Sequence, residues 1–128
     1  MKTEKKNPLS KGIDKKGTAD VLRTIHKEES SVSKAVGKKL GLIKKAVDDA
    51  VKTIQGGGRV VYIGAGTSGR LGVLDASEIP PTFGAKSFEA KIAGGSKAVT
   101  NAVEGAEDDE KAGETAVSKI DKKDMLVG

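Results

Sequence analysis

One short segment limits what this chain can fold into: an apolar run that passes through a glycine-rich turn into a helical pattern. The run Val60–Ile63 is continuously apolar and rich in β-branched residues, which is typical of a strand buried on both faces. The turn Gly64–Arg70 has glycine at its first, third and sixth positions. A helical pattern starts at Leu71, so the segment predicts a strand, a tight turn and a helix in succession.

The same alternation continues along the rest of the sequence. Phe88–Ala93 predicts a second strand, a helical pattern runs from Val99 to about Ile120, and Met125–Val127 begins a third strand. Pro80–Pro81 predicts the end of the helix that starts at Leu71. Alternating strands and helices predict an α/β fold, in which a parallel sheet carries flanking helices.

The residues before the first strand predict a helical arm. Residues 1–17 show no periodicity and predict an extended or mobile tail. A short amphipathic helix is expected from Thr18 to about Lys27, and Ser30 and Ser31 are candidate N-caps for a longer helix that Gly56–Gly58 ends. In that longer helix the apolar residues recur at steps of three and four: Val36, Leu40, Ile43, Val47, Val51 and Ile54.

Composition excludes several classes of site. The chain has no cysteine, which excludes disulfides, thiolate metal ligands and thiol catalysis. Its single histidine, His26, excludes a histidine-clustered metal site, and we expect this residue to be structural or on the surface. No apolar run reaches the length of about 18 residues that a membrane span needs, and no apolar segment follows the N-terminal lysines as in a signal peptide. We therefore expect a cytoplasmic protein without a metal.

The net charge of +5 is unevenly distributed. Residues 1–52 carry 14 basic and seven acidic side chains, whereas residues 53–128 carry nine and 11. A basic half can indicate nucleic-acid binding. However, 20 of the 23 basic residues are lysines and aromatic residues are nearly absent, while base recognition and stacking favour arginine and aromatic side chains. We expect solvated helix faces and no nucleic-acid partner.

The glycine-rich turn is a candidate anion site. Glycine lets the backbone approach a ligand closely, and the free N–H groups and the dipole at a helix N-terminus favour an anion. Thr67 and Ser68 add two hydroxyl donors, and Arg70 could add charge. The spacing also fits a dinucleotide-binding turn, although Ile92–Gly94 is apolar where that fold needs a ribose-binding carboxylate. The spacing leaves a phosphate, a dinucleotide and no ligand open.

Two acidic positions are candidates for acid–base chemistry. Glu78 is expected near the C-terminal end of its helix, beside Pro80–Pro81, where the helix dipole and partial desolvation would raise the pKa of a carboxyl group. Glu104 and Glu107 are three residues apart and would share a helix face. For each of them the alternative is an ordinary solvated carboxylate, and the spacing does not demonstrate a two-carboxylate mechanism.

Several blocks of the sequence resemble one family. They are Gly57–Glu78, Pro80–Gly84, Ile92–Gly95 and Ala102–Asp109, together with the opening Thr3–Pro8. In this order they are similar to the N-acetylmuramic acid 6-phosphate etherases, which belong to the SIS (sugar-isomerase) fold family and are related to the glucokinase regulatory protein. The resemblance covers nearly the whole chain.

The resemblance implies a carbon–oxygen lyase of cell-wall amino-sugar recycling. Such an enzyme cleaves the D-lactyl ether of N-acetylmuramic acid 6-phosphate by elimination and water addition, giving N-acetylglucosamine 6-phosphate and D-lactate, with no metal and no cofactor. By position, Glu78 matches the proton donor and Glu107 the second acid/base carboxylate. The substrate phosphate would be bound by Gly66, Thr67, Ser68 and Gly69.

The resemblance also implies an organisation for the chain. We expect a tail and helical arm over residues 1–56 and a partial SIS domain, a Rossmann-like three-layer sandwich, over residues 57–128. Leu126–Gly128 stands just before the family's second phosphate-contacting loop, so the chain is expected to be truncated and could be an inactive fragment or one that folds through a partner half. A homodimer acting on a small amino-sugar phosphate is implied. The alternative is a non-catalytic, sugar-phosphate-binding regulatory SIS domain.

Overall fold

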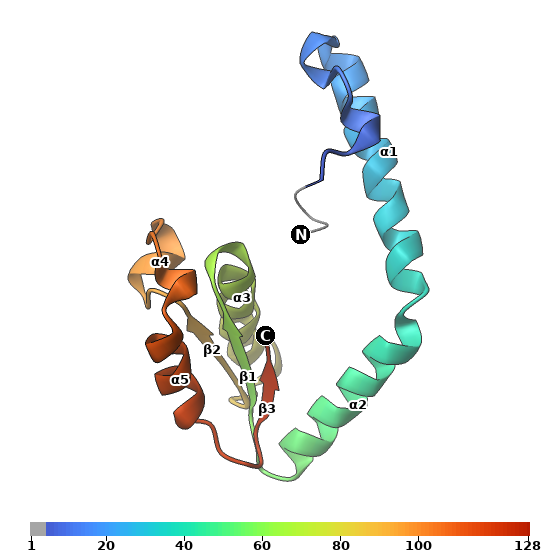
Figure 1. The fold of residues 1–128 in the computed structure, drawn as a ribbon. Helices are drawn as coiled ribbons and strands as arrows, with labels where there is room; N and C mark the ends of the chain where they lie inside the picture. The colour runs from blue at the N-terminus through green and yellow to red at the C-terminus, as the bar shows by residue number, and fades with distance from the viewer. Residues whose placement is uncertain (1–4) are drawn as a thin grey trace. The chain divides into compact units, whose positions relative to one another are not determined.

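A computed structural model describes residues 5–128 (Figure 1). The helices are α1 (Thr18–Gly37), α2 (Leu40–Gln55), α3 (Gly66–Phe83), α4 (Lys97–Thr100) and α5 (Glu110–Ser118), and the strands are β1 (Val60–Gly64), β2 (Phe88–Ile92) and β3 (Met125–Val127). Contacts group the chain into two compact units, residues 1–45 and 46–128, with the boundary inside α2. The division into residues 1–56 and 57–128 stays a prediction.

The N-terminal unit differs from the sequence-based expectation. α1 is one continuous helix, and Ser30 and Ser31 do not cap a second one. Their hydroxyls donate to the carbonyls of His26 and Glu28, at 2.9 and 2.7 Å, because a serine inside a helix can bond to the preceding turn. The break between α1 and α2 falls at Lys38–Lys39 instead.

The tail is also more regular than expected where it is described. Pro8–Ser10 and Ile13–Lys15 form short 3-10 turns. The side chain of Asn7 caps the first of them by accepting the N–H of Leu9 at 2.9 Å. Residues 1–4 of the expected tail lie outside the described residues.

A parallel sheet forms the centre of the second unit. Its strand order is β2-β1-β3, with Val60 opposite Phe88 on one side and Met125 on the other. The middle strand holds the core, since Val60 is 2% and Val61 0% exposed. The three strands lie where the sequence predicts them, and the α/β fold is confirmed.

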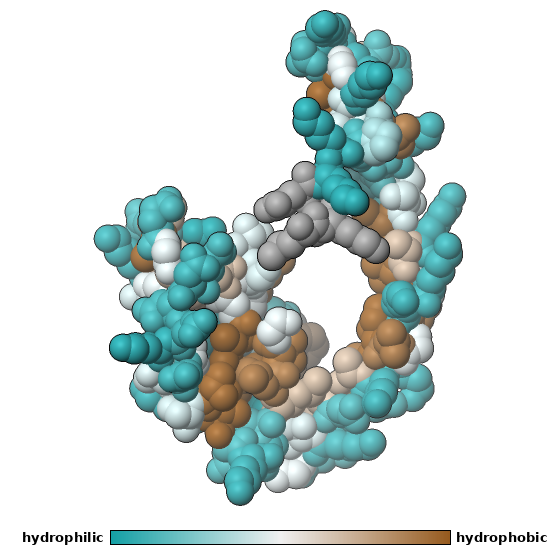
Figure 2. All heavy atoms as spheres, viewed as in Figure 1, coloured by the Kyte–Doolittle hydropathy of each residue, from teal (hydrophilic) through white to brown (hydrophobic). Residues whose placement is uncertain are grey.

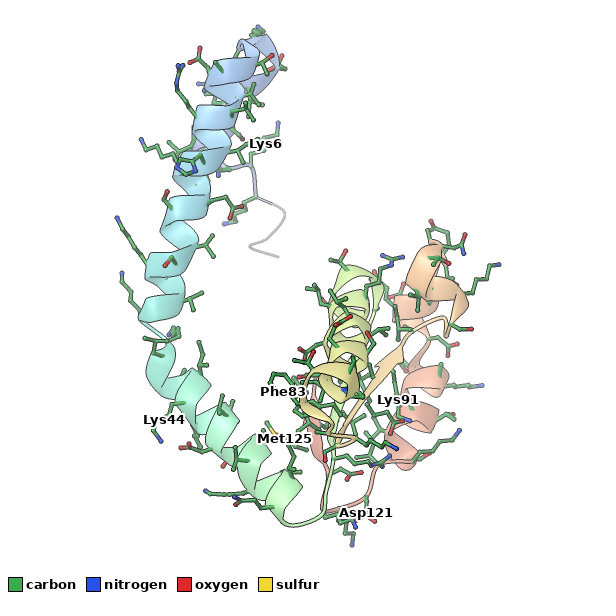
Figure 3. The ribbon with its side chains drawn as sticks, turned by 180° about the vertical axis from the view of Figure 1, so that it is seen from behind. Lys6, Lys44, Phe83, Lys91, Asp121 and Met125 are labelled. Atoms are coloured by element: carbon green, nitrogen blue, oxygen red, sulfur yellow. The ribbon has the colours of Figure 1, made fainter. Side chains whose placement is uncertain are left out.

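Helices cover both faces of this sheet. The connection from β1 to β2 and the connection from β2 to β3 run in opposite directions across the sheet. Right-handed crossovers therefore place α3 on one face and α5 on the other, as Figures 1 and 3 show from opposite sides. This arrangement brings the start of α3 and the segment before α5 to the carboxyl ends of β1 and β2.

Two helix boundaries differ from the prediction. α3 continues through Pro80 and Pro81 and ends at Gly84, whose φ of +68° and N–H bond to the carbonyl of Pro80, at 2.9 Å, close the last turn. Each proline removes only one backbone bond, and both stand in that last turn, where the cap keeps the chain helical.

The helix predicted from Val99 to Ile120 is interrupted. After α4 the chain is extended at Asn101, turns through Gly105 at a φ of +70°, and forms a 3-10 turn over Ala106–Asp108. α5 starts only after Asp109, whose side chain caps it by accepting the N–H of Ala112 at 2.9 Å. Glu107 therefore stands on a 3-10 turn, which helical periodicity did not predict. Among residues 5–128, no helix is long and apolar enough to span a membrane.

Candidate functional site

Glycines of the turn hold α3 directly against the sheet. A Cβ on Gly69 would lie 2.6 Å from the carbonyl oxygen of Gly64 and 2.7 Å from Cγ1 of Ile92. A Cβ on Gly72 would lie 2.8 Å from Cβ of Tyr62. Only glycine allows this approach, so the turn sequence fixes the N-terminus of α3 at the carboxyl end of β1.

The N-terminus of α3 offers free hydrogen-bond donors. The residue before the helix is Ala65, which has no side-chain oxygen to cap it. The N–H groups of Gly66, Thr67 and Ser68 belong to the first turn, where no carbonyl of the helix can accept them, and all three residues are exposed. Gly69 differs, because it is buried and its N–H donates to the carbonyl of Ala65 at 3.1 Å. The anion-binding capacity of the turn therefore lies in residues 66–68.

A pocket of about 360 Å³ lies at the same edge of the sheet. The turn contributes Ala65, Gly66 and Arg70 to its lining, and the segment 101–108 contributes Glu104 and Glu107. Glu107 also lines a second pocket of about 340 Å³, between the sheet and α5. The structure thus brings a predicted catalytic carboxylate next to the start of α3.

Arg70 has a structural contact that sequence reasoning did not predict. Its Nε donates to the carbonyl of Val99 at 3.0 Å and its Nη2 to the carbonyl of Asn101 at 3.1 Å. The guanidinium therefore ties the end of α4 to α3. These bonds support the segment that carries Glu104 and Glu107. The Nε and Nη2 groups of Arg70 thus donate to backbone carbonyls.

Glu78 is not part of this arrangement within one copy of the chain. It is exposed and stands 12 residues after Gly66 on the same helix, which is about 18 Å along the axis at about 1.5 Å per residue. The desolvation expected from Pro80–Pro81 is therefore absent. The structure does not bring Glu78 and Glu107 together.

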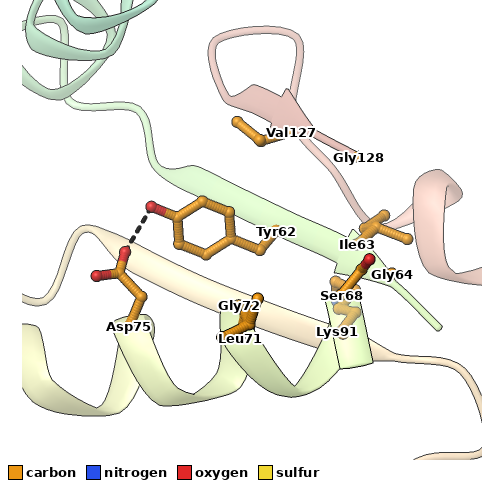
Figure 4. Close-up of a pocket in the computed structure, with 11 residues that line it drawn as sticks. Tyr62, Ile63, Gly64, Ser68, Leu71, Gly72, Asp75, Lys91, Val127 and Gly128 are labelled. Atoms are coloured by element: carbon orange, nitrogen blue, oxygen red, sulfur yellow. Dashed lines mark hydrogen bonds between the residues drawn. The ribbon is translucent and has the colours of Figure 1, made fainter. Parts of the chain in front are cut away.

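A third pocket, of about 350 Å³, lies between α3 and the β1–β3 side of the sheet (Figure 4). Inside it the hydroxyl of Tyr62 donates to Oδ2 of Asp75 at 2.6 Å. Burial, followed by this hydrogen bond, raises the pKa of Tyr62 to about 12. Sequence reasoning missed this pair, although a lone tyrosine in an apolar strand was a signal for a polar partner. The pocket includes Ser68 but neither Glu78 nor Glu107.

Among the described residues, no group of three or more histidine, aspartate or glutamate side chains is placed to hold a metal ion.

Comparisons with known proteins add sequence evidence. A family model described as "Glucokinase regulatory protein N-terminal SIS domain" matches residues 42–128. Over the whole chain, the sequence is 48% identical to an N-acetylmuramic acid 6-phosphate etherase of Actinobacillus pleuropneumoniae and covers 43% of that relative's length. It is also similar over the whole chain to proteins of the same name from Aeromonas hydrophila, at 49% identity, and Lactobacillus gasseri, at 46% identity, and covers 44% of each. The chain spans less than half the length of the curated relatives it matches.

Proposed function

The chain belongs to the SIS-domain family that the glucokinase regulatory protein model describes, and from that premise we propose that it is the N-terminal, phosphate-binding part of an N-acetylmuramic acid 6-phosphate etherase. The relatives that match its whole length carry that name. The structural observation that supports the proposal is one pocket lined by both the uncapped start of α3 and Glu107. Its action in cytoplasmic recycling of cell-wall amino sugars is part of the same proposal.

The phosphate of the substrate would bind at the start of α3. The N–H groups of Gly66, Thr67 and Ser68 and the two hydroxyls surround the positive end of the helix, and a phosphate is stabilised by both donors and dipole. Gly69 would contribute indirectly, because its lack of a side chain allows the turn to lie against Gly64 and Ile92. The backbone therefore supplies most of this site.

Glu107 would act on the part of the sugar next to that phosphate. In the proposed reaction a base removes the proton beside the carbonyl of the ring-opened sugar, and the carbon–oxygen bond to lactate breaks. The departing oxygen takes up a proton from an acid, and water then adds to the unsaturated sugar to give N-acetylglucosamine 6-phosphate. A carboxylate that shares the pocket with the phosphate loop is placed for one of these proton transfers.

Glu78 is proposed as the proton donor with one further condition. At about 18 Å from Gly66 along α3, it is too far away to touch a single sugar that is bound at the turn of the same copy. We infer that Glu78 acts only in a site completed by more protein than residues 5–128 of one copy. The expected signature is loss of turnover in Glu78→Gln with sugar-phosphate binding unchanged.

A second candidate function is a regulatory domain that binds a sugar phosphate without turning it over. The description of the matching family model favours it, since that family is named after a regulatory protein. It uses the same phosphate loop and differs in needing no carboxylate.

The experiment is a thermal melt of the chain with and without N-acetylglucosamine 6-phosphate, combined with an assay for D-lactate release from N-acetylmuramic acid 6-phosphate. A ligand that binds only the folded state must raise the melting temperature. We expect such a rise in the parent chain and a smaller rise in Thr67→Ala/Ser68→Ala, which lacks the two hydroxyl donors but keeps the backbone N–H groups. Ser77→Ala is the matched control, because this exposed serine of the same helix bonds only to the carbonyl of Leu74 in the structure.

Each outcome separates the candidates. D-lactate release that disappears in Glu107→Gln supports the etherase. Ligand stabilisation without D-lactate release, in this chain and in one extended to the length of the relatives, supports the regulatory domain. A melt that is indifferent to the sugar phosphate but rises with NAD would contradict both and support a dinucleotide site.

A further inference from the structure

A second cavity adjoins the pocket at the start of α3. It is the pocket of about 340 Å³ between the sheet and α5, which we call the α5 pocket. Four residues line both this cavity and the pocket of about 360 Å³ at the start of α3: Ala65, Ala93, Ala106 and Glu107. The two pockets therefore adjoin each other, with Glu107 at their junction. A ligand bound at the start of α3 has room to extend past Glu107 into the α5 pocket.

The lining of the α5 pocket is apolar and consists mainly of small residues. Of its 14 residues, 11 are glycine, alanine or isoleucine, and α5 contributes Ala112, Gly113 and Ala116. This helix has no extensive contact with β1 or β2, and a Cβ on Gly113 would meet nothing within 4 Å, so space remains between helix and sheet. By contrast, Figure 2 shows hydrophilic side chains over the outer surface of α5. A cavity of this size with apolar walls and few polar groups is typical of a small-molecule site.

The charged residues of the α5 pocket favour a neutral group. Nζ of Lys91 lies 3.0 Å from Oε1 of Glu89, so its charge is compensated. The two other charged residues of the lining, Glu107 and Asp109, are exposed carboxylates, and Asp109 is held in place by the N–H of Ala112 at 2.9 Å. Like charges disfavour a bound group that carries its own carboxylate, whereas burial favours a neutral group with an apolar end.

We propose that the α5 pocket binds the N-acetyl group of the sugar phosphate whose phosphate lies at the start of α3. The inference rests on the proposed function. In the proposed substrate the acetamido nitrogen is attached to the carbon beside the carbonyl, which is the carbon that loses its proton. Glu107 is placed for a proton transfer there, and the α5 pocket adjoins Glu107. The D-lactyl group carries a carboxylate and does not suit this pocket. The cavity is thereby assigned as the part of the site that distinguishes N-acetylated sugar phosphates from those with a hydroxyl at this carbon.

Titration calorimetry of the chain with two ligands tests the assignment. N-acetylglucosamine 6-phosphate and glucose 6-phosphate differ only at this carbon, where one carries an acetamido group and the other a hydroxyl. We expect the N-acetylated sugar to bind about tenfold more tightly, which is the discrimination that an apolar pocket achieves for a small apolar group. Equal affinities would overturn the inference and leave the proposed phosphate site intact. Binding of neither sugar would contradict both.

Ala116→Leu fills the proposed subsite. Ala116 is half-buried, and at about 100° per residue Ala112 and Gly113 project within about 60° of it, so it stands in the middle of the face that lines the pocket. The affinity for N-acetylglucosamine 6-phosphate should fall to that for glucose 6-phosphate. The affinity for glucose 6-phosphate should stay unchanged, which shows that the variant is folded. Ser118→Leu is the matched control, because it adds the same side chain about 160° away at an exposed position and should keep the preference.

Gly113→Leu is the second filling variant. It adds its side chain to the same pocket from a position where a Cβ has open space, and it decides the test if Ala116→Leu does not fold. A tenfold preference for the N-acetylated sugar that survives in a folded filling variant would overturn the proposal. Loss of both sugars in both variants would overturn it too, because the cavity would then not be separate from the phosphate site.

Discussion

Arg59 connects the starts of all three strands through two carboxylates. Its backbone N–H donates to Oδ1 of Asp124 at 2.7 Å, and its guanidinium reaches Oδ2 of the same residue at 2.6 Å and Glu89 at 2.5 Å. Lys91 binds the other oxygen of Glu89 at 3.0 Å. The side chain of Asp124 is fully covered, and its hydrogen bonds from Arg59 hold the pKa at about 2, below the ordinary 3.8. This cluster fastens β3 to the sheet at the end opposite the candidate site.

The lowered pKa of Asp124 predicts how stability depends on pH. A carboxyl group with a lower pKa in the folded state stabilises the fold above its unfolded pKa, about 4, and this contribution is lost as the pH falls from about 4 to 2. Urea denaturation between pH 6 and about 2 should show that loss in the parent chain. The Asp124→Asn variant should be less stable than the parent chain at pH 6, and its free energy of unfolding should change less between pH 6 and about 2.

Asp20→Asn is the control for that prediction. Asp20 pairs with Arg23 at 2.7 Å, but both side chains are largely exposed, and exposed pairs contribute little. The free energy of unfolding of Asp20→Asn should match that of the parent chain at every pH between 6 and about 2. An Asp124→Asn curve parallel to the parent curve would show that the Arg59 pair does not set the pH dependence.

At the scale of the elements, the contact between α3 and the two strands decides where the candidate site lies. Gly64, Gly69 and Gly72 bring helix and strands to a separation that no other residue allows. Arg70 then ties the segment after α4 to the same helix. The start of α3 and Glu107 line the same pocket because of these backbone-level contacts.

Gly69→Ala tests the helix–strand contact. Its Cβ would stand 2.6 Å from a backbone oxygen that cannot move without disturbing β1, so we expect a loss of about 1–3 kcal/mol of stability. Gly113→Ala in α5 meets nothing within 4 Å and should gain about 0.5–1 kcal/mol from lower chain entropy in a helix. Chemical denaturation measures both. Equal effects of the two substitutions would mean that α3 does not pack as described.

At the scale of the molecule, burial is concentrated in one place. Val60, Val61 and Ala98 are the buried apolar residues among those described, and neither α1 nor α2 contains a buried residue. Local stability follows the number of buried contacts around a segment. The two helices of the arm should therefore open far more often than β1.

Hydrogen exchange measures this difference. We expect the amides of Val61 and Tyr62 to exchange roughly 100-fold more slowly, or slower still, than amides in the middle of α1. Uniform exchange along the chain would contradict the concentrated core.

The sequence by itself determined the local features of this protein. The β-branched run at residues 60–63 and the short segments 88–92 and 125–127 form strands. The glycines of residues 64–69 specify a tight turn, because they act on the backbone within a few residues. The parallel α/β fold follows from their order. The helix boundaries were harder to predict, because caps such as Gly84 and Asp109 outweigh periodicity at the ends of a helix.

Only the tertiary structure decided which of the candidate residues line the same pocket. Glu107 lines a pocket together with the start of α3 because the crossovers and the two bonds of Arg70 bring segment 101–108 there. Glu78 remains about 18 Å from Gly66 along α3, because a rigid helix fixes the distance between its own residues. Spacing along the chain cannot show this, since the distance between two side chains depends on which ends of the elements the packing joins.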